Sequence, residues 1–166
     1  MPRFGITGHV NLTADSVPLV YRAITDALSP YAGTDLTGVS CIARGADSIF
    51  AKVVLDLGGR LEVLVPAENY RAKKVPPEDA PQFDELLDRA AEVKVLPYAE
   101  ADPEAYEAAN QEMVAVSDLV FAVWDGRHDG GQGSTASTVK YAQAKGVPVE
   151  VIWPDGAARG TPSDAG

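Results

Sequence analysis

Short apolar runs alternate with stretches of helical periodicity along almost the whole chain. Helical spacings of three and four recur between these runs, as at Val17, Val20 and Ile24. The apolar runs predict strands at residues 4–7, 38–42, 61–65, 93–96, 119–124 and 147–153. Alternation with short connections favours parallel pairing and right-handed crossovers. The sequence therefore predicts a three-layer α/β sandwich with a mostly parallel sheet of about six strands.

One segment interrupts this alternation. Residues 67–81 follow the third predicted strand and contain Pro76, Pro77 and Pro81, which break helices. Irregular segments longer than about a dozen residues are often functional or disordered. We expect either a flap over a pocket or a surface loop.

The length of 166 residues fits one domain, which we place at residues 1–154. Residues 155–166, DGAARGTPSDAG, predict a disordered C-terminal tail. The N-terminus carries no apolar signal run, and no stretch is apolar enough to cross a bilayer. These features predict a cytoplasmic protein with no membrane partner.

Charge and residue counts exclude several kinds of site. The formal net charge of −10 argues against a nucleic-acid surface, so we expect no nucleic-acid partner. A small anionic ligand stays possible, because a helix start and one arginine can bind it locally. Cys41 is the only cysteine, and His9 and His128 are the only histidines, so no disulfide and no metal site are expected.

The richest segment lies between residues 117 and 148. An apolar strand ends at Asp125 and is followed by a loop with Gly126, Gly130, Gly131 and Gly133, after which Ser134 and Thr135 open a helix. Unpaired N–H groups and the helix dipole favour an anion at such a start. This pattern predicts a phosphate cradle. The alternative is a strand-to-helix turn that needs glycine for geometry alone.

Other loops follow the carboxyl ends of the predicted strands, where ligands bind in sheets of this kind. Thr7, Gly8 and His9 follow the first strand, and His9 is either a ligand-binding or acid–base group or a structural hydrogen-bonding residue. Tyr70, after the third strand, is a candidate for stacking on a base. Asp125 is expected either to bind ribose hydroxyls or to fix the following loop.

The segment ARGADS precedes the second predicted helix. Arg44 and Gly45 stand directly before it, and Asp47 lies in its first turn. Arg44 can clamp a phosphate through two donors. Asp47 is either a ligand-binding group or an ordinary acid at a helix start.

Four motifs occur together in an order that resembles the SLOG superfamily, which joins DprA-type and LOG-like ("lysine decarboxylase-like") proteins. These motifs are GITGH, ARGAD, SDLVFAVWDG with GGQGST, and KYAQAKGVPV. The last block is also similar to nucleoside deoxyribosyltransferases. The resemblance spans residues 3–153 and implies a modified Rossmann fold, a nucleotide or nucleotide-derived ligand with its phosphate on residues 130–135, and a homodimer.

Catalytic members of this superfamily cleave N-glycosidic bonds with a glutamate in the pattern GGxGTxxE. Ser137 stands at the corresponding position here, and no glutamate occurs between Glu112 and Glu150. Serine cannot replace the carboxylate in this chemistry. Related proteins also often carry GHR where this chain has His9–Val10. Both departures favour binding over catalysis.

The sequence thus leaves three functions open. The first is a sensor or binding module for a nucleotide-like ligand, with no other cofactor. The second is an N-glycosidase, phosphoribohydrolase or deoxyribosyltransferase-like enzyme acting on nucleoside monophosphates. Such an enzyme would need a different carboxylate, for which Asp47, Asp125 and Asp129 are available. The third is a non-catalytic assembly module with an empty crevice.

Overall fold

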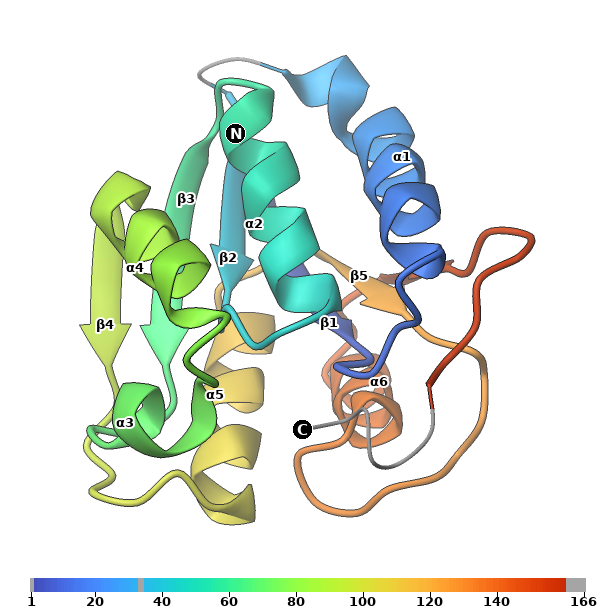
Figure 1. The fold of residues 1–166 in the computed structure, drawn as a ribbon. Helices are drawn as coiled ribbons and strands as arrows, with labels where there is room; N and C mark the ends of the chain where they lie inside the picture. The colour runs from blue at the N-terminus through green and yellow to red at the C-terminus, as the bar shows by residue number, and fades with distance from the viewer. Residues whose placement is uncertain (1, 33–34, 161–166) are drawn as a thin grey trace.

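Six parallel strands form one central sheet in the computed structural model, which describes residues 2–32 and 35–160 (Figure 1). The strands are β1 (Arg3–Gly8), β2 (Thr37–Ser40), β3 (Arg60–Val65), β4 (Glu92–Val95), β5 (Leu119–Val123) and β6 (Val149–Ile152). Their order across the sheet is β4-β3-β2-β1-β5-β6, and each neighbouring pair is parallel. The predicted α/β architecture is confirmed.

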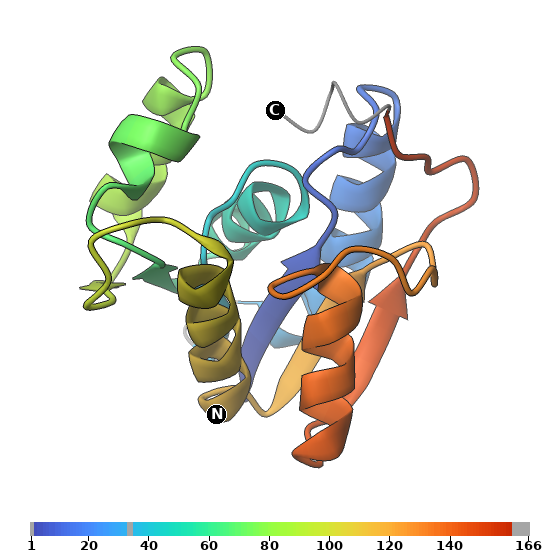
Figure 2. The same cartoon turned by 90° about the horizontal axis from the view of Figure 1, so that it is seen from below.

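Helices cover both faces of the sheet. They are α1 (Ser16–Leu28), the 3₁₀ turn η1 (Ser29–Tyr31), α2 (Ala46–Asp56), α3 (Tyr70–Lys74), α4 (Ala80–Arg89), α5 (Pro103–Ala115) and α6 (Thr135–Ala144). Helices α1, α2 and α4 lie on one face, while α5 and α6 lie on the other (Figure 2). Phe50 of α2 and Met113 of α5 are fully buried on opposite sides of the sheet.

The strand order reverses beside β1. The chain runs outward from β1 through β2 and β3 to β4, and then returns to place β5 on the other side of β1. The carboxyl ends of the parallel strands lie at one edge of the sheet, where the following loops converge. This edge is where ligands bind in open α/β sheets.

Local signals explain where the helices begin. At α5, the side chain of Asp102 accepts a hydrogen bond from the Ala105 N–H at 2.9 Å, and Pro103 occupies the first turn. At α6, Ser134 accepts a bond from the Ser137 N–H at 3.1 Å. The predicted opening of a helix at Ser134 and Thr135 is confirmed, and a capping acid followed by proline accounts for the start of α5.

The segment 67–81 is more regular than its prolines suggested. It contains the short helix α3, and α4 already begins at Ala80. Pro76 and Pro77 follow α3. Pro81 lies in the first turn of α4, where backbone N–H groups make no hydrogen bond within the helix, so proline costs none. The prolines therefore separate two helices.

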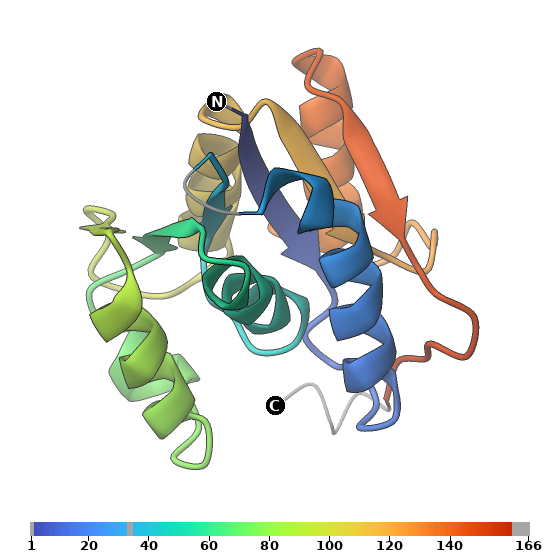
Figure 3. The ribbon, with the colours of Figure 1, turned by 90° about the horizontal axis from the view of Figure 1, so that it is seen from above.

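The C-terminal segment does not leave the molecule at residue 155. Residues 155–160 return beside the start of α1 (Figure 3), where Ala158 O accepts a bond from Thr13 N–H at 3.1 Å and Leu12 pairs with Arg159 in an antiparallel bridge. Backbone pairing fixes this part of the expected tail despite its polar composition. The remainder, 161–166, lies outside the described residues.

Candidate functional site

A pocket of about 330 Å³ opens at the carboxyl ends of β1, β2 and β3. It lies within the size range of small-molecule sites, about 300–1,000 Å³. Its wall comes from the loops after these strands, from α3, α4 and α5, and from the start of α6. Seven of the predicted site residues line it: Thr7, Gly8, Arg44, Asp47, Tyr70, Gly133 and Thr135. The other seven are not among its lining residues: His9, Gly45, Asp125, Gly126, Gly130, Gly131 and Ser134.

Gly45 shapes the turn between β2 and α2. Its φ is +80°, and a Cβ at this position would lie 2.5 Å from the carbonyl oxygen of His9. The N–H of Ala46 donates to that same oxygen at 3.2 Å. Gly45 therefore lets the start of α2 contact the β1–α1 loop directly. In this way Gly45 positions Arg44 and Asp47.

The same turn contains a strained residue. Ile42 lines the pocket with φ at +45°, a conformation that β-branched residues rarely adopt. Its N–H donates to Ser40 Oγ at 3.0 Å, and Ser40 Oγ donates to the carbonyl of Asp47 at 3.0 Å. These bonds hold the turn in one shape beneath the pocket.

Asp47 is a buried carboxyl in the pocket wall. It is 8% exposed and lies in the first turn of α2. Burial raises the pKa of Asp47 from 3.8 to about 7, although a hydrogen bond from the Ala43 backbone acts in the opposite direction. The carboxyl therefore exchanges its proton near neutral pH.

Arg44 forms an ion pair with a carboxylate of the pocket wall. Its Nε lies 3.3 Å from Asp79 Oδ2, and both side chains are partly exposed. Asp79 precedes α4, so the pair joins the β2–α2 turn to the α3–α4 connection. A guanidinium has five donors, so an ion pair through Nε leaves Arg44 with further donors for an anion.

Aromatic side chains form another part of the wall. The Tyr70 ring centroid lies 5.9 Å from that of Phe83 and 6.2 Å from that of Tyr106, the second pair edge-to-face. Burial raises the pKa of Tyr70 far above its usual range, so its hydroxyl remains a hydrogen-bond donor. The wall can contact a flat apolar group.

Only the last part of the glycine-rich loop reaches the pocket. Gly133, with φ at +83°, approaches α5 so closely that a Cβ would lie 3.0 Å from Tyr106 Cβ. The Gly133 carbonyl accepts a bond from Asn110 Nδ2 at 3.2 Å. Helix α5 thus positions the start of α6, where Thr135 lines the pocket. By contrast, Gly126, Gly130 and Gly131 are exposed.

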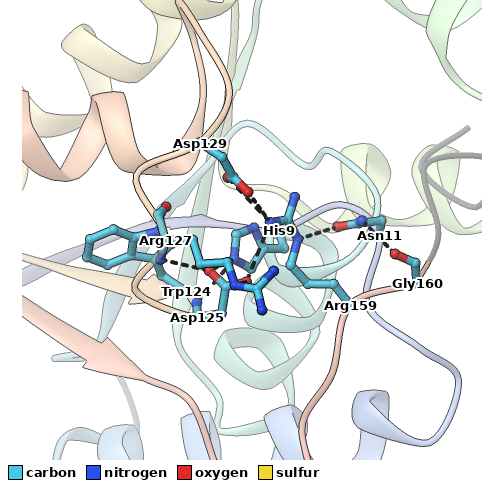
Figure 4. A network of polar contacts seen from close by, with 8 residues as sticks. All are labelled: His9, Asn11, Trp124, Asp125, Arg127, Asp129, Arg159 and Gly160. Atoms are coloured by element: carbon cyan, nitrogen blue, oxygen red, sulfur yellow. Dashed lines mark hydrogen bonds and ion pairs between the residues drawn. The ribbon is translucent and has the colours of Figure 1, made fainter.

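His9 and Asp125 belong to a different cluster beside the pocket (Figure 4). His9 Nε2 accepts a hydrogen bond from the Asp125 N–H at 3.1 Å. Arg159 Nη1 lies 3.5 Å from Asp125 Oδ2 and 3.1 Å from Asp129 Oδ2, and Arg159 Nε donates to Asn11 Oδ1 at 3.2 Å. We call these five residues the Arg159 network.

The charged side chains of the Arg159 network pair with one another. Burial and then the charge of Arg159 lower the pKa of His9, which is consistent with a neutral imidazole whose Nε2 accepts a bond. Burial acts to raise the pKa of Asp125, but the Arg127 N–H, His9 and Arg159 together bring it below its usual value. Of the two readings left open for Asp125, this geometry favours the one in which it fixes the loop.

Sequence reasoning missed the contribution of two helices. Tyr106 and Asn110 of α5, and Gln82 and Phe83 of α4, line the pocket although neither helix was expected there. A usable signal was the polar Tyr106 and Asn110 one turn apart next to buried Ala109. Among the described residues, no group of three or more potential ligands forms a metal site, and no helix is long and apolar enough to span a membrane.

Known structures share this fold at low sequence identity. DprA from Streptococcus pneumoniae has a TM-score of 0.65 and 18% identity over 99% of this chain and 53% of that chain. DprA from Helicobacter pylori, described with a single-stranded DNA binding mode, has a TM-score of 0.64 and 18% identity over 90% of this chain and 64% of its own. The chain therefore has a SLOG-type fold. It spans less than two thirds of either DprA chain.

A third structure extends the comparison. The molybdenum cofactor carrier protein from Chlamydomonas reinhardtii has a TM-score of 0.57 and 16% identity, over 90% of this chain and 75% of that chain. No protein-family model matches the chain, and no curated protein matches it. The resemblance drawn from four motifs is thus confirmed at the level of the SLOG-type fold.

The expectation of no nucleic-acid partner is wrong on this comparison, because DprA with this fold binds single-stranded DNA. The expectation rested on a net charge of −10. Net charge averages over the whole surface and does not describe local groups, such as Arg44 and Lys74, which both line the pocket.

Proposed function

We propose that the pocket binds a nucleotide unit, with its phosphate between Arg44 and the start of α6. The observation that carries this proposal is the convergence of Arg44, Gly133 and Thr135 in one pocket. The first N–H groups of a helix have no partner within it and favour an anion, and Arg44 supplies a positive charge beside them. The aromatic wall supplies a surface for the base or sugar.

Arg44→Gln tests the phosphate contact. Calorimetric titration with AMP, GMP and the corresponding nucleosides should show that the phosphate contributes to affinity. Loss of a hydrogen bond to a charged group should weaken monophosphate binding about tenfold or more and leave nucleoside binding unchanged. Arg89→Gln, on the exposed side of α4, is the matched control. Equal affinity of Arg44→Gln and the parent protein for monophosphates would contradict the proposal.

A second candidate ligand is a nucleotide unit within single-stranded DNA, which the fold shared with DprA favours. Fluorescence anisotropy with a labelled oligothymidine over a range of salt concentrations separates it from free nucleotides. If Arg44 and Lys74 contact two phosphates, log K should fall with log salt at a slope of about −1.4. Binding of mononucleotides but not of the strand would select the first candidate.

Of the three carboxylates named for the N-glycosidase alternative, Asp47 lines the pocket, whereas Asp125 and Asp129 are not among its lining residues. A carboxyl with a pKa of about 7 is suited to proton transfer at neutral pH. Chromatography of AMP incubated with the protein measures free adenine directly. Adenine release that disappears in Asp47→Asn would establish the enzyme in place of the binding module.

A further inference from the structure

Asp47 is the one acidic side chain that is buried among the described residues, and the protein gives its carboxyl no positive partner. No ion pair in the described part of the chain includes Asp47, and Arg44, which also lines the pocket, is paired with Asp79. A buried carboxylate without a cation is strongly disfavoured unless it gains hydrogen bonds or a proton. In the unliganded pocket, protonation of the Asp47 carboxyl removes the buried charge near neutral pH.

The surrounding groups reinforce this situation. Cys41 and Tyr70 lie close enough that the charge of Asp47 contributes to raising the pKa of each. The other titratable groups that line the pocket are Arg44, Lys74, Asp79 and Tyr106. Lys74 is exposed on α3. Within residues 2–32 and 35–160, the Ala43 backbone alone provides a hydrogen bond that favours the charged form of Asp47.

A purely structural role does not account for this placement. An acid at a helix start gains from the dipole at an exposed position, without the penalty of burial. Asp47 instead lies in the wall of a pocket large enough for a small molecule. A carboxylate in that wall is a strong acceptor for donors on a guest.

We propose that Asp47 accepts hydrogen bonds from a donor group of the bound nucleotide and releases its proton to solvent when that ligand binds. This inference rests on the function proposed above. The donor is either a ribose hydroxyl or a base N–H, which share the chemistry that a carboxylate recognises. The carboxyl O–H bond breaks, its proton passes to the buffer base, and the ligand donor keeps its own proton and hydrogen-bonds to the resulting carboxylate; no other covalent bond changes.

Proton release is measured by titration calorimetry with AMP in two buffers of different ionisation enthalpy. At pH 7, about half of the Asp47 carboxyls carry a proton, so about half a proton should be released per AMP bound, falling to nearly none at pH 9. Affinity should be about tenfold higher at pH 8 than at pH 6. Because the AMP phosphate also titrates near pH 6, adenosine 5′-sulfate provides a ligand whose charge is constant.

Asp47→Asn should bind adenosine 5′-sulfate without proton release and without this pH dependence. Asp88→Asn, an exposed carboxyl on α4, is the control and should behave like the parent protein. Circular dichroism and thermal unfolding establish that both variants fold. If Asp47→Asn does not fold, the pH dependence of adenosine 5′-sulfate binding by the parent protein still tests the role of Asp47.

The source of the donor follows from ligand variants. If a ribose hydroxyl donates, 2′-deoxy-AMP or 2′,3′-dideoxy-AMP should bind about tenfold more weakly and release fewer protons. If the adenine amino group donates, inosine monophosphate should show these losses instead. Binding of adenosine 5′-sulfate that is independent of pH overturns the role of Asp47 and leaves the nucleotide pocket intact. Failure of both AMP and adenosine 5′-sulfate to bind overturns this inference. If GMP and the labelled oligothymidine also fail to bind, the proposed nucleotide-binding function is overturned as well.

Discussion

Two acid-bearing regions lie side by side at the carboxyl edge of the sheet, and the protein treats them in opposite ways. In the Arg159 network, Asp125 and Asp129 share a guanidinium, and the pKa of Asp125 is lowered. In the pocket, Asp47 has no cationic partner, and burial raises its pKa to about 7. Carboxylates whose partners come from the chain stabilise the fold, whereas a buried carboxyl that lacks them is available to a ligand.

The largest expected effect concerns stability against pH. The folded pKa of Asp47 lies above its unfolded value of 3.8, so the free energy of unfolding should fall as pH rises from about 4 to about 7. At about 1.4 kcal/mol per pKa unit, the upper limit of this loss is about 4 kcal/mol. Asp47→Asn should remove it and be more stable than the parent protein at pH 8.

Urea unfolding of both proteins at pH 5 and pH 8 measures this difference. The gain in Asp47→Asn should be fully present at pH 8 and less than half as large at pH 5, because the unfolded chain has already lost most of the Asp47 proton at pH 5. A variant that is less stable than the parent at pH 8 would show that the carboxylate has a partner that the structure does not reveal.

Arg159→Gln tests the other region, with the opposite sign. The pKa of Asp125 is lowered in the folded state, so its contribution to stability is present above the unfolded value and is lost as pH falls through the folded value. Because Arg159 is partly exposed, we expect a loss of about 1 kcal/mol at pH 7. This loss should disappear in acid.

The same variant sharpens the comparison through binding. Arg159 does not line the pocket, so AMP affinity of Arg159→Gln should equal that of the parent protein. Thermal unfolding at pH 7 and pH 3 measures the loss of stability, and calorimetric titration measures the affinity for AMP. A large loss of AMP affinity would place the network within the binding site and remove the distinction between the two regions.

The smallest effect is expected for Asn110→Ala. Its side chain donates to the Gly133 carbonyl at 3.2 Å and so holds the glycine-rich loop at the pocket edge. Loss of one neutral hydrogen bond should weaken AMP binding by about two- to fivefold, with a similarly small loss of stability. Gln143→Ala, on the exposed part of α6, is the control. Unchanged AMP affinity would show that the loop holds its position without Asn110.

Local patterns were sufficient to predict the fold. The apolar runs ending at Thr7 and Trp124, and the capping residues Asp102 and Ser134, lie next to the elements that they define. The periodicity of a strand or helix is contained in a few neighbouring residues. The architecture therefore follows from the sequence, except for the order of the strands in the sheet. Arg44 and Asp47 reached the pocket for the same reason, since both adjoin the end of β2.

Contacts between distant segments could not be predicted in this way. His9 and Asp125 do follow neighbouring strands, but their partner Arg159 lies in a segment whose composition suggested disorder. Tyr106 reaches the pocket only because α5 packs beside the glycine-rich loop. Both outcomes depend on side chains more than 20 residues apart, which no local period records.

A crystal structure with AMP tests the central claim most directly. We predict the phosphate within hydrogen-bond distance of Arg44 and the Thr135 N–H, and a ribose or base donor on Asp47. AMP bound at Asp125 and Arg159, with this pocket empty, would contradict the account.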